Sequence, residues 1–219
     1  MPQAPAASPA AVAQGPHCVL IVTDVQNDFV EGGALAVPDG AAVVPVINAL
    51  ARRYANVVLT QDWHPADHRS FASQHAGAKP FATVQMPYGP QILWPDHCVQ
   101  GSRGAALHPD LDIPHAQMVL RKGFHRAVDS YSAFLEADRS TRTGLDGYLA
   151  ARGITEVHLC GLATDFCVGW SALDARQFGL ATVVIEDACR AIGLGDSLGQ
   201  AWAAMAEAGV ARVQSATLT

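Results

Sequence analysis

The 219-residue sequence has few charged residues and no long hydrophobic run. Asp, Glu, Lys and Arg make up 16% of the chain, and the formal net charge is -6. This balance argues against nucleic acid or an anionic membrane surface as a partner. No apolar stretch approaches the roughly 20 residues that a membrane-spanning helix needs. The sequence therefore predicts a soluble globular protein that binds neither nucleic acid nor membrane.

Cysteine is scarce, and its spacing gives no sign of disulfides. The five cysteines are odd in number and contain no C-x-x-C pair, which argues against a disulfide framework or a zinc ribbon. Unpaired cysteines are typical of a reducing compartment, so we expect a cytoplasmic protein. The five are Cys18, Cys98, Cys160, Cys167 and Cys189.

No internal repeat or break in composition divides the chain, so we expect a single domain over residues 17–219. Residues 1–16 are rich in Ala and Pro and lack both a basic segment and a sustained apolar core. They are predicted to form a disordered N-terminal tail rather than a signal peptide.

Short apolar runs alternate with segments of helical periodicity along the domain. This alternation predicts an α/β fold, a three-layer α/β/α sandwich around a central, mostly parallel sheet of about six strands. The segment 66–96 shows little periodicity, which is typical of a functional loop or of short helices. Strands are expected near 18–22, 57–60, 117–120, 156–160, 181–185 and 210–213, and the longer helices near 41–54 and 194–208.

The stretch 161–168, G-L-A-T-D-F-C-V, joins a predicted strand to a helix that ends near Gly179. Cys167 then lies about one turn into the helix, with Thr164 or Asp165 as N-cap. Unpaired amides and the helix dipole there favour a thiolate, and the amides can hold the oxygen of a tetrahedral adduct. The alternative is a small, inert cysteine packed under a helix.

Two more reactive side chains follow predicted strands. Asp24 ends the first strand and Lys122 ends the third, at the sheet edge where ligand sites form in open parallel sheets. Taken singly, Asp24 could be a cap and Lys122 a solvated edge residue. Together with Cys167 they supply a nucleophile, a proton acceptor and a cation, which predicts covalent catalysis.

A carboxylate and an imidazole also share one face of a strand end. Asp62 and His64 are two residues apart, and such a pair is a half-site for zinc, iron or manganese. His68 and His97 are the candidates for a third ligand. Cys98 is next to His97 and should point elsewhere, so it is not counted.

Five motifs resemble those of the nicotinamidase/pyrazinamidase branch of the isochorismatase-like cysteine hydrolases. The similarity runs from about residue 17 to the C-terminus with the motifs in matching order. They are D-V-Q-N-D-F (24–29), Q-D-W-H-P (61–65), W-P-D-H-C (94–98), K-G (122–123) and G-L-A-T-D-F-C-V (161–168).

The resemblance implies an enzyme that hydrolyses nicotinamide and pyrazinamide to the acid and ammonia through a covalent thioester, for NAD salvage. It implies one divalent metal ion per chain, with zinc expected and iron or manganese as alternatives, and it leaves a homo-oligomer open. The implied site residues are Asp24, Lys122 and Cys167 as the catalytic triad, Asp62, His64 and His97 as metal ligands, and Phe29, Trp94 and Tyr131 in the substrate pocket. Leu35 is added to this pocket because it is an apolar residue of the same loop as Phe29.

The resemblance further implies a cis peptide bond between Leu162 and Ala163, with the amides of Ala163 and Cys167 as the oxyanion hole. His68 matches a position that is a ligand in some relatives only. Two rival interpretations stay open: a cysteine amidohydrolase acting on a ureido or carbamoyl compound, and a non-catalytic scaffold or redox thiol protein. Bound metal would distinguish a nicotinamidase from the first rival, because many such amidohydrolases lack the D-x-H…H set of ligands.

Overall fold

The computed structural model describes residues 15–218, so most of the predicted tail, residues 1–14, lies outside the described residues. Its core is a six-stranded sheet in which every neighbouring pair is parallel, in the order β5-β2-β1-β6-β7-β8. The prediction of a central sheet of about six strands is confirmed. The strands are β1 (Cys18–Thr23), β2 (Val57–Asp62), β5 (Met118–Lys122), β6 (Glu156–Leu162), β7 (Ala181–Arg190) and β8 (Ala211–Val213).

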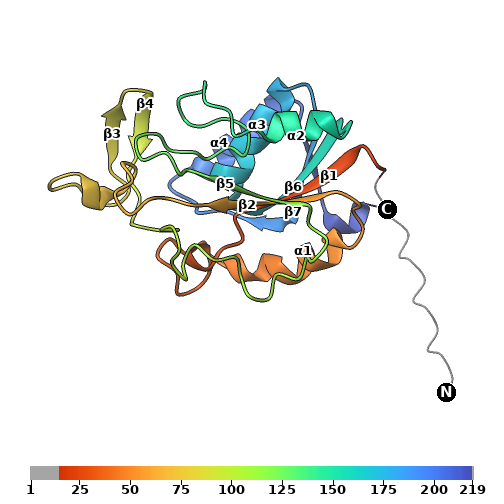
Figure 1. Ribbon diagram of the computed structural model, residues 1–219, viewed down its shortest axis with the longest axis horizontal. Coiled ribbons are helices and arrows are strands. Elements are labelled where there is room, and N and C mark those ends of the chain that lie inside the picture. The colour runs from red at the N-terminus through yellow and green to blue at the C-terminus, as the bar shows by residue number, and fades with distance from the viewer. Residues whose placement is uncertain (1–14, 219) are drawn as a thin grey trace, which may run out of the picture.

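Helices cover both faces of this sheet and complete the three layers (Figure 1). One face carries α1 (Val43–Ala51), while α2 (Leu145–Ala151) and α3 (Gly169–Gln177) cover the other. α4 (Ser197–Glu207) contacts α3 and β8. Because crossover connections of this kind place helices on both sides of a parallel sheet, the predicted α/β/α sandwich is the observed fold.

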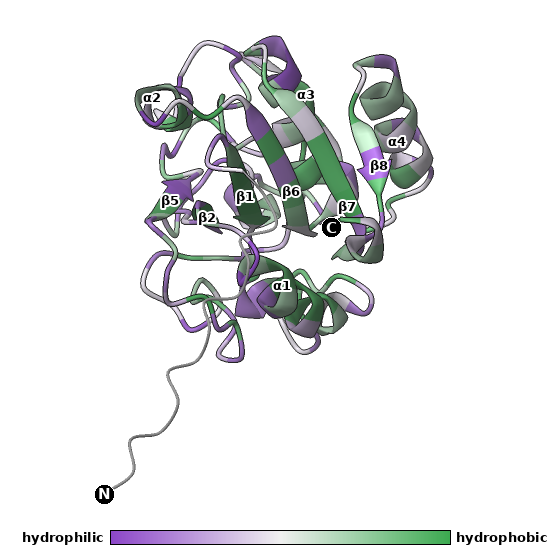
Figure 2. Cartoon of the chain, turned by 90° about the vertical axis from the view of Figure 1, so that its right-hand side faces the viewer, coloured by the Kyte–Doolittle hydropathy of each residue, from purple (hydrophilic) through white to green (hydrophobic). Residues whose placement is uncertain are grey.

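Burial explains the apolar runs from which the strands were predicted. All six residues of β1 and all six of β2 are buried, as expected for strands covered on both faces. The edge strand β5 alternates instead, and its Val119 is 50% exposed. In Figure 2 β1 is coloured as hydrophobic and β5 largely as hydrophilic.

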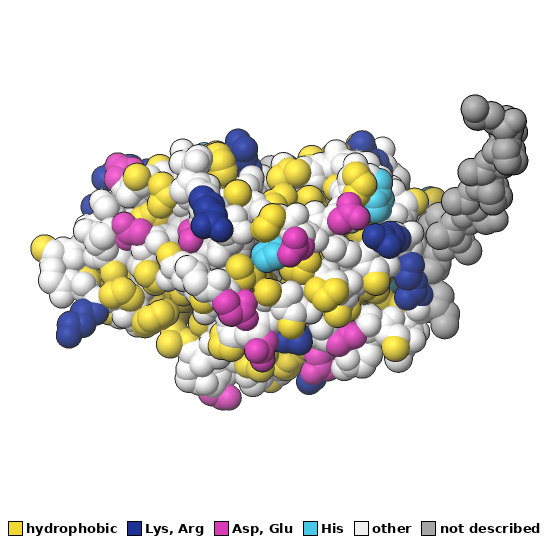
Figure 3. Space-filling view, turned by 90° about the horizontal axis from the view of Figure 1, so that it is seen from below, with side chains coloured by type: hydrophobic (Ala, Val, Ile, Leu, Met, Phe, Trp, Pro, Cys, Tyr) yellow, Lys and Arg dark blue, Asp and Glu magenta, His cyan; other side chains and the backbone are white. Residues whose placement is uncertain are grey.

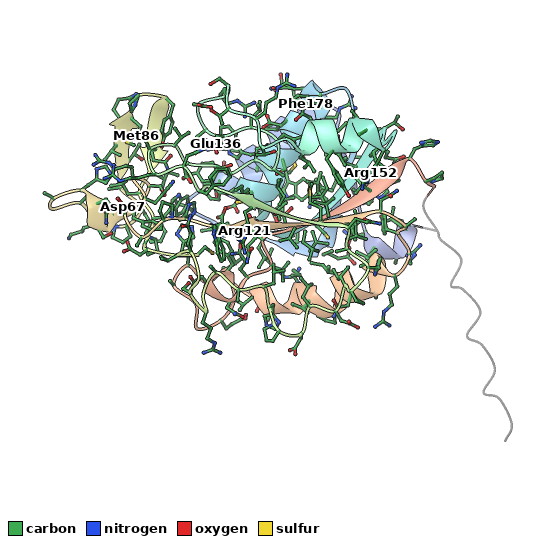
Figure 4. The ribbon with its side chains drawn as sticks, in the orientation of Figure 1. Asp67, Met86, Arg121, Glu136, Arg152 and Phe178 are labelled. Carbon is green, nitrogen blue, oxygen red and sulfur yellow. The ribbon has the colours of Figure 1, made fainter. Side chains whose placement is uncertain are left out.

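The strand order reverses between β1 and β6, which lie side by side. Ligands of open parallel sheets bind outside the carboxyl ends of the strands at such a switch point. Gly161 is required here, because a Cβ on it would lie 2.1 Å from the Thr23 carbonyl oxygen and its φ is +113°. In Figure 4 the labels Asp67 and Met86 mark this end of the molecule and Arg152 marks the opposite end.

Part of the segment 66–96 is a β-hairpin that the sequence did not predict. After a short 3-10 turn (Ala72–Gln74), β3 (Thr83–Met86) pairs antiparallel with β4 (Gly89–Ile92). The strands are four residues long, and β4 begins Gly-Pro, so neither shows a recognisable apolar pattern. The hairpin lies at the end of the molecule where the parallel strands finish (Figure 1).

Two predicted boundaries differ from those observed. α1 is shorter than the helix expected over 41–54, and Pro45 lies in its first turn, where proline is tolerated. β7 continues to Arg190 rather than ending at 185. Its polar residues Glu186 and Asp187 stay in the strand, since Arg212 and Ser215 donate hydrogen bonds to their carboxylates.

Among residues 15–218, no helix is both long and apolar enough to cross a membrane. The α1 face of the molecule carries acidic and basic side chains scattered among hydrophobic ones (Figure 3). Lys and Arg do not form a continuous patch on that face, which agrees with the expectation from net charge.

Replacing Leu159 with Ala should lower the free energy of unfolding by about 2–5 kcal/mol, because it removes a core side chain from β6 and leaves a cavity. Leu159 is fully buried in the sheet. Val119→Ala is the control, and this exposed change should cost less than about 0.5 kcal/mol. Urea unfolding of both variants measures the difference, and equal effects would contradict the assignment of β6 to the core.

Candidate active site

The ammonium of Lys122 joins three predicted site residues into one group. Its Nζ lies 2.8 Å from the Asp24 carboxylate and 3.5 Å from the Cys167 Sγ, and it also pairs with the Asp62 carboxylate. It also donates to the Ser130 carbonyl at 2.9 Å. Lys122 is fully buried, and a lysine tolerates such burial only when it is paired in this way.

Sheet topology brings these residues together. Asp24 directly follows β1, where it adopts a left-handed conformation with φ of +47°. Lys122 ends β5 and faces Asp62 in the strand register, so it reaches across β2 toward β1. Cys167 follows β6, on the other side of β1.

The Asp24 carboxylate is held in a fixed orientation by a neighbouring hydroxyl. Thr60 Oγ1 donates to Asp24 Oδ1 at 2.6 Å and accepts the Asp24 backbone N–H at 3.1 Å. The other carboxylate oxygen therefore faces Lys122 and the thiol. One oxygen of Asp24 lies within 4.8 Å of the Cys167 Sγ, close enough for a proton to pass between them after a small movement.

Burial dominates the protonation of this group. It raises the pKa of the Cys167 thiol well above its usual value, and Lys122 only partly opposes this. Burial also raises the pKa of Asp24, again against the effect of Lys122. Burial alone would lower the pKa of Lys122, but the Asp24 and Asp62 carboxylates hold it well above its usual value. The group thus combines a fixed cation with a thiol that needs a base to ionise.

The expected capping of the Cys167 helix is wrong. Residues Thr164–Val168 form a π-helical turn before α3, its N-cap is Ala163, and no side chain caps it. The Asp165 carboxylate instead binds a distant segment, accepting the backbone N–H of Ile192 at 2.9 Å. Burial raises the pKa of the Cys167 thiol, so its ionisation would depend on Lys122 and a nearby base as well as on the amides of the turn. The peptide bond between Leu162 and Ala163 is cis, as the resemblance implies.

Asp62, His64 and His97 form a compact group of metal-binding side chains. Their ligand atoms lie within 4.8 Å of one another, and all three residues are buried. The Nε2 atoms of His64 and His97 lie 3.6 and 3.9 Å from the Asp62 Oδ2. Asp62 thus divides its oxygens, with Oδ1 toward Lys122 and Oδ2 toward the two imidazoles.

Hydrogen bonds to the other ring nitrogen show that this group fits a metal ion. His64 Nδ1 donates to the Gly123 carbonyl at 2.7 Å, and His97 Nδ1 donates to the Pro95 carbonyl at 2.8 Å. Each Nε2 is thereby left free to ligate, the usual arrangement for metal-bound histidine. Gly123 permits the contact, because a Cβ there would lie 2.4 Å from the His64 ring. Two imidazoles and one carboxylate suit zinc and leave open positions.

His68 and Cys98 lie beside the metal-binding group but face other partners. His68 Nδ1 accepts the Ser70 backbone N–H at 3.3 Å, and its Nε2 donates to the Val128 carbonyl at 3.2 Å. Its ring packs against that of His64, with centroids 4.4 Å apart. Because both ring nitrogens of His68 are hydrogen-bonded, its contribution to the group is the packing of its ring against that of His64. Cys98 is buried next to the group without joining it, as expected.

The side chains converge on one enclosed pocket. All four predicted lining residues line it: Phe29, Leu35, Trp94 and Tyr131. The Tyr131 hydroxyl accepts the Trp94 indole N–H at 3.0 Å, which fixes both aromatic rings. The pocket has a free volume of about 20 Å³, enough for little more than one water molecule.

Sequence reasoning missed several residues that shape this site. Asp129, Phe166 and Ile192 also line the pocket. Gln26 pairs with the backbone N–H and carbonyl of Asp62, and Asp28 accepts the Cys98 N–H at 2.7 Å. Gln26, Asp28 and Phe166 stand within the motifs, so their presence there was the available signal. Asp129 and Ile192 lie in segments without any recognisable motif.

Fold and site together define a class of protein: a three-layer α/β/α domain with a parallel sheet, whose Cys, Asp and Lys side chains meet at the carboxyl ends of the strands. A family model described as the isochorismatase domain matches residues 18–217. The chain belongs to the isochorismatase family. A nicotinamidase of Acinetobacter baylyi is 57% identical over 202 residues, which cover 92% of this chain and 94% of that protein.

Solved structures agree with this assignment. A nicotinamidase/pyrazinamidase of Acinetobacter baumanii superposes with a TM-score of 0.93 at 56% identity, covering 94% of this chain and 100% of that one. A pyrazinamidase of Pyrococcus horikoshii in complex with zinc gives a TM-score of 0.75 at 32% identity, covering 91% and 99%.

Replacing Lys122 with Met should lower the free energy of unfolding at pH 7 by about 3–5 kcal/mol, because Asp24 and Asp62 lose their shared cation. Burial already raises the pKa of Asp24 in the folded protein, and loss of the Lys122 cation should raise it further above the unfolded value of about 4. Protonation then favours the folded variant, so the deficit relative to wild type should shrink as the pH falls toward 4. Denaturant unfolding in chelator across pH 4–8 measures this. Exposed Lys79→Met should show no deficit, and a pH-independent deficit in Lys122→Met would contradict the ion-pair assignment.

Proposed function

We propose that this protein is a nicotinamidase that hydrolyses nicotinamide, and also pyrazinamide, to the carboxylic acid and ammonia. The observation that carries the proposal is that Cys167 and the metal-binding group line one aromatic pocket, while Lys122 contacts Cys167, Asp24 and Asp62. The names of the highly identical relatives support the substrate. Release of nicotinic acid places the reaction in NAD salvage, and five free cysteines fit a reducing cytoplasm.

Asp24 is the proton carrier of the proposed reaction. It takes the proton of Cys167, whose sulfur forms a bond to the carboxamide carbon while the carbonyl becomes an oxyanion. The Asp24 carboxylic acid then donates this proton to the nitrogen as the C–N bond breaks, releasing ammonia and leaving a thioester. Asp24 next removes a proton from water, which attacks the thioester and frees the acid and the thiol. A pKa raised by burial suits a residue that must both accept and donate.

Lys122 and the backbone stabilise the charges that this sequence creates. The Lys122 ammonium is within hydrogen-bonding range of the thiolate and stays charged throughout, because two carboxylates hold its pKa high. The amides of Ala163 and Cys167 are the proposed donors to the oxyanion, at the turn that follows β6. Formation and hydrolysis of the thioester each create a tetrahedral oxyanion at the same carbon, so the same two backbone N–H groups can stabilise both.

Asp62, His64 and His97 would hold one divalent ion, for which we propose zinc. When bound, the ion offers an open coordination position that can accept the ring nitrogen of the substrate. The zinc-bound pyrazinamidase relative supports this choice. The aromatic faces of Phe29, Trp94 and Tyr131 would contact the ring, while the carboxamide lies toward Cys167.

Cys167→Ala should abolish ammonia release from nicotinamide while leaving binding of the substrate measurable, because the pocket does not depend on the thiol. Asp24→Asn should lower kcat by about 10² to 10⁴-fold, the usual contribution of a general acid/base. Ammonia release by purified wild type and both variants is the assay, and calorimetry measures binding. Near-full activity of either variant would remove that residue from the mechanism. A wild type inactive on nicotinamide but active on a carbamoyl compound would favour the rival amidohydrolase.

Elemental analysis should find about one divalent metal ion per chain, and His97→Ala should lose it, because only two of the three protein ligands typical of a catalytic zinc site would remain. His68→Ala is the matched control, since His68 uses both nitrogens elsewhere, and it should retain most of the metal. Metal-loaded wild type should turn over benzamide, which lacks the ring nitrogen, far more slowly than nicotinamide. Equal rates on the two amides would mean that the metal does not anchor the ring.

A further inference from the structure

The buried carboxylate of Asp165 ties down the segment that connects β7 to α4. It accepts the backbone N–H of Ile192 at 2.9 Å, the N–H of Gly193 at 2.8 Å and the hydroxyl of Ser197. Asp165 is 6% exposed, and it forms no salt bridge with any group in residues 15–218. Its charge is therefore balanced by three donors that all belong to residues 191–197, which we call the cover segment.

The cover segment separates two cavities. On its inner side Ile192 lines the active-site pocket beside Phe166 and Cys167. On its outer side Leu194 and Ser197 line a groove of about 400 Å³ between α3 and α4. Phe166 borders both cavities, so the pocket and the groove are neighbours with the cover segment between them.

The cover segment has two glycines that can serve as hinges. Its Gly193 and Gly195 have φ of +72° and +61°, and both residues are exposed. Trp94 and Tyr131, by contrast, are hydrogen-bonded to each other, and Asp62 and Lys122 belong to strands of the sheet. The pocket has a free volume of only about 20 Å³, so movement of one wall would make room for a six-membered ring.

We propose that Asp165 is a positioning residue that latches the cover segment, so that Ile192 closes the pocket over a bound carboxamide. Release of the latch opens the pocket toward the groove between α3 and α4, which is the entry route. The description of the ligand as a carboxamide rests on the proposed function. The latch itself is a property of Asp165 and the cover segment.

Three substitutions separate the latch from general effects of charge or folding. Asp165→Asn keeps the shape of the side chain but leaves only one oxygen that can accept a hydrogen bond. The new NH₂ group faces a donor of the cover segment and cannot accept from it. Ser197→Ala removes one donor without touching the turn around Cys167, and it serves if Asp165→Asn folds poorly. Asp196→Asn is the control, because Asp196 is an exposed carboxylate in the same segment whose side chain does not cap α4.

Alkylation of cysteines, mapped by peptide mass spectrometry, measures opening of the pocket without any substrate. Each protein is treated with small iodoacetamide or bulky fluorescein maleimide, and the rate at Cys167 is measured for each reagent. The labelling rate of Cys167 with fluorescein maleimide, divided by its rate with iodoacetamide, should rise about tenfold in Asp165→Asn. This is the effect expected from the loss of one hydrogen bond to a charged group. Ser197→Ala should show a smaller rise, and Asp196→Asn should match wild type.

The four other cysteines report global unfolding, because all of them are buried. In the latch variants they should stay unlabelled while Cys167 reacts. An unchanged ratio in Asp165→Asn would overturn the proposal, and so would faster labelling of all five cysteines together.

Steady-state kinetics provide a second readout in Asp165→Asn. KM for nicotinamide should rise about tenfold with kcat changed much less, because closure binds the ring while the thiol and Asp24 stay in place. A fall in kcat at constant KM would overturn the positioning role. A wild type without activity on nicotinamide would refute the proposed function, yet the labelling ratio would still decide the latch.

Discussion

The whole site depends on one buried ammonium. Lys122 pairs with Asp24 on one side and Asp62 on the other, so it connects the group around Cys167 with the metal-binding group. Neither carboxylate could remain ionised at this depth without a cation, since desolvation is the largest influence on the pKa of each. Lys122 likewise keeps its charge only because both carboxylates surround it.

The ion pairs of Lys122 require a fixed strand register between β1, β2 and β5. Lys122 lies opposite Asp62 in the parallel register, and Thr60 on β2 orients the Asp24 carboxylate beyond β1. A shift of one residue in either strand would turn these side chains to the other face of the sheet. The cover segment is held differently, because the Asp165 carboxylate accepts its backbone N–H groups at Ile192 and Gly193.

Much of the fold was predictable because buried parallel strands are continuous apolar runs, as in β1 and β2. The hairpin β3–β4 was not, since short strands outside the main sheet need no such pattern. Thr164 or Asp165 was predicted to cap the Cys167 helix because local rules favour Thr and Asp there, and the contact of Asp165 with Ile192, 27 residues away, has no local signature. The π-helical turn around Cys167 was missed for the same reason.

The sequence by itself determined the chemical groups and their places at strand ends: a thiol at Cys167, a carboxylate at Asp24, an ammonium at Lys122 and the D-x-H pair at Asp62 and His64. Tertiary structure alone decided how they interact. It distinguishes the two candidate histidines by their hydrogen bonds: a backbone carbonyl accepts from Nδ1 of His97, whereas both ring nitrogens of His68 are hydrogen-bonded. It also raises the pKa of the thiol, because desolvation depends on what surrounds a group in space and not on its neighbours in the chain.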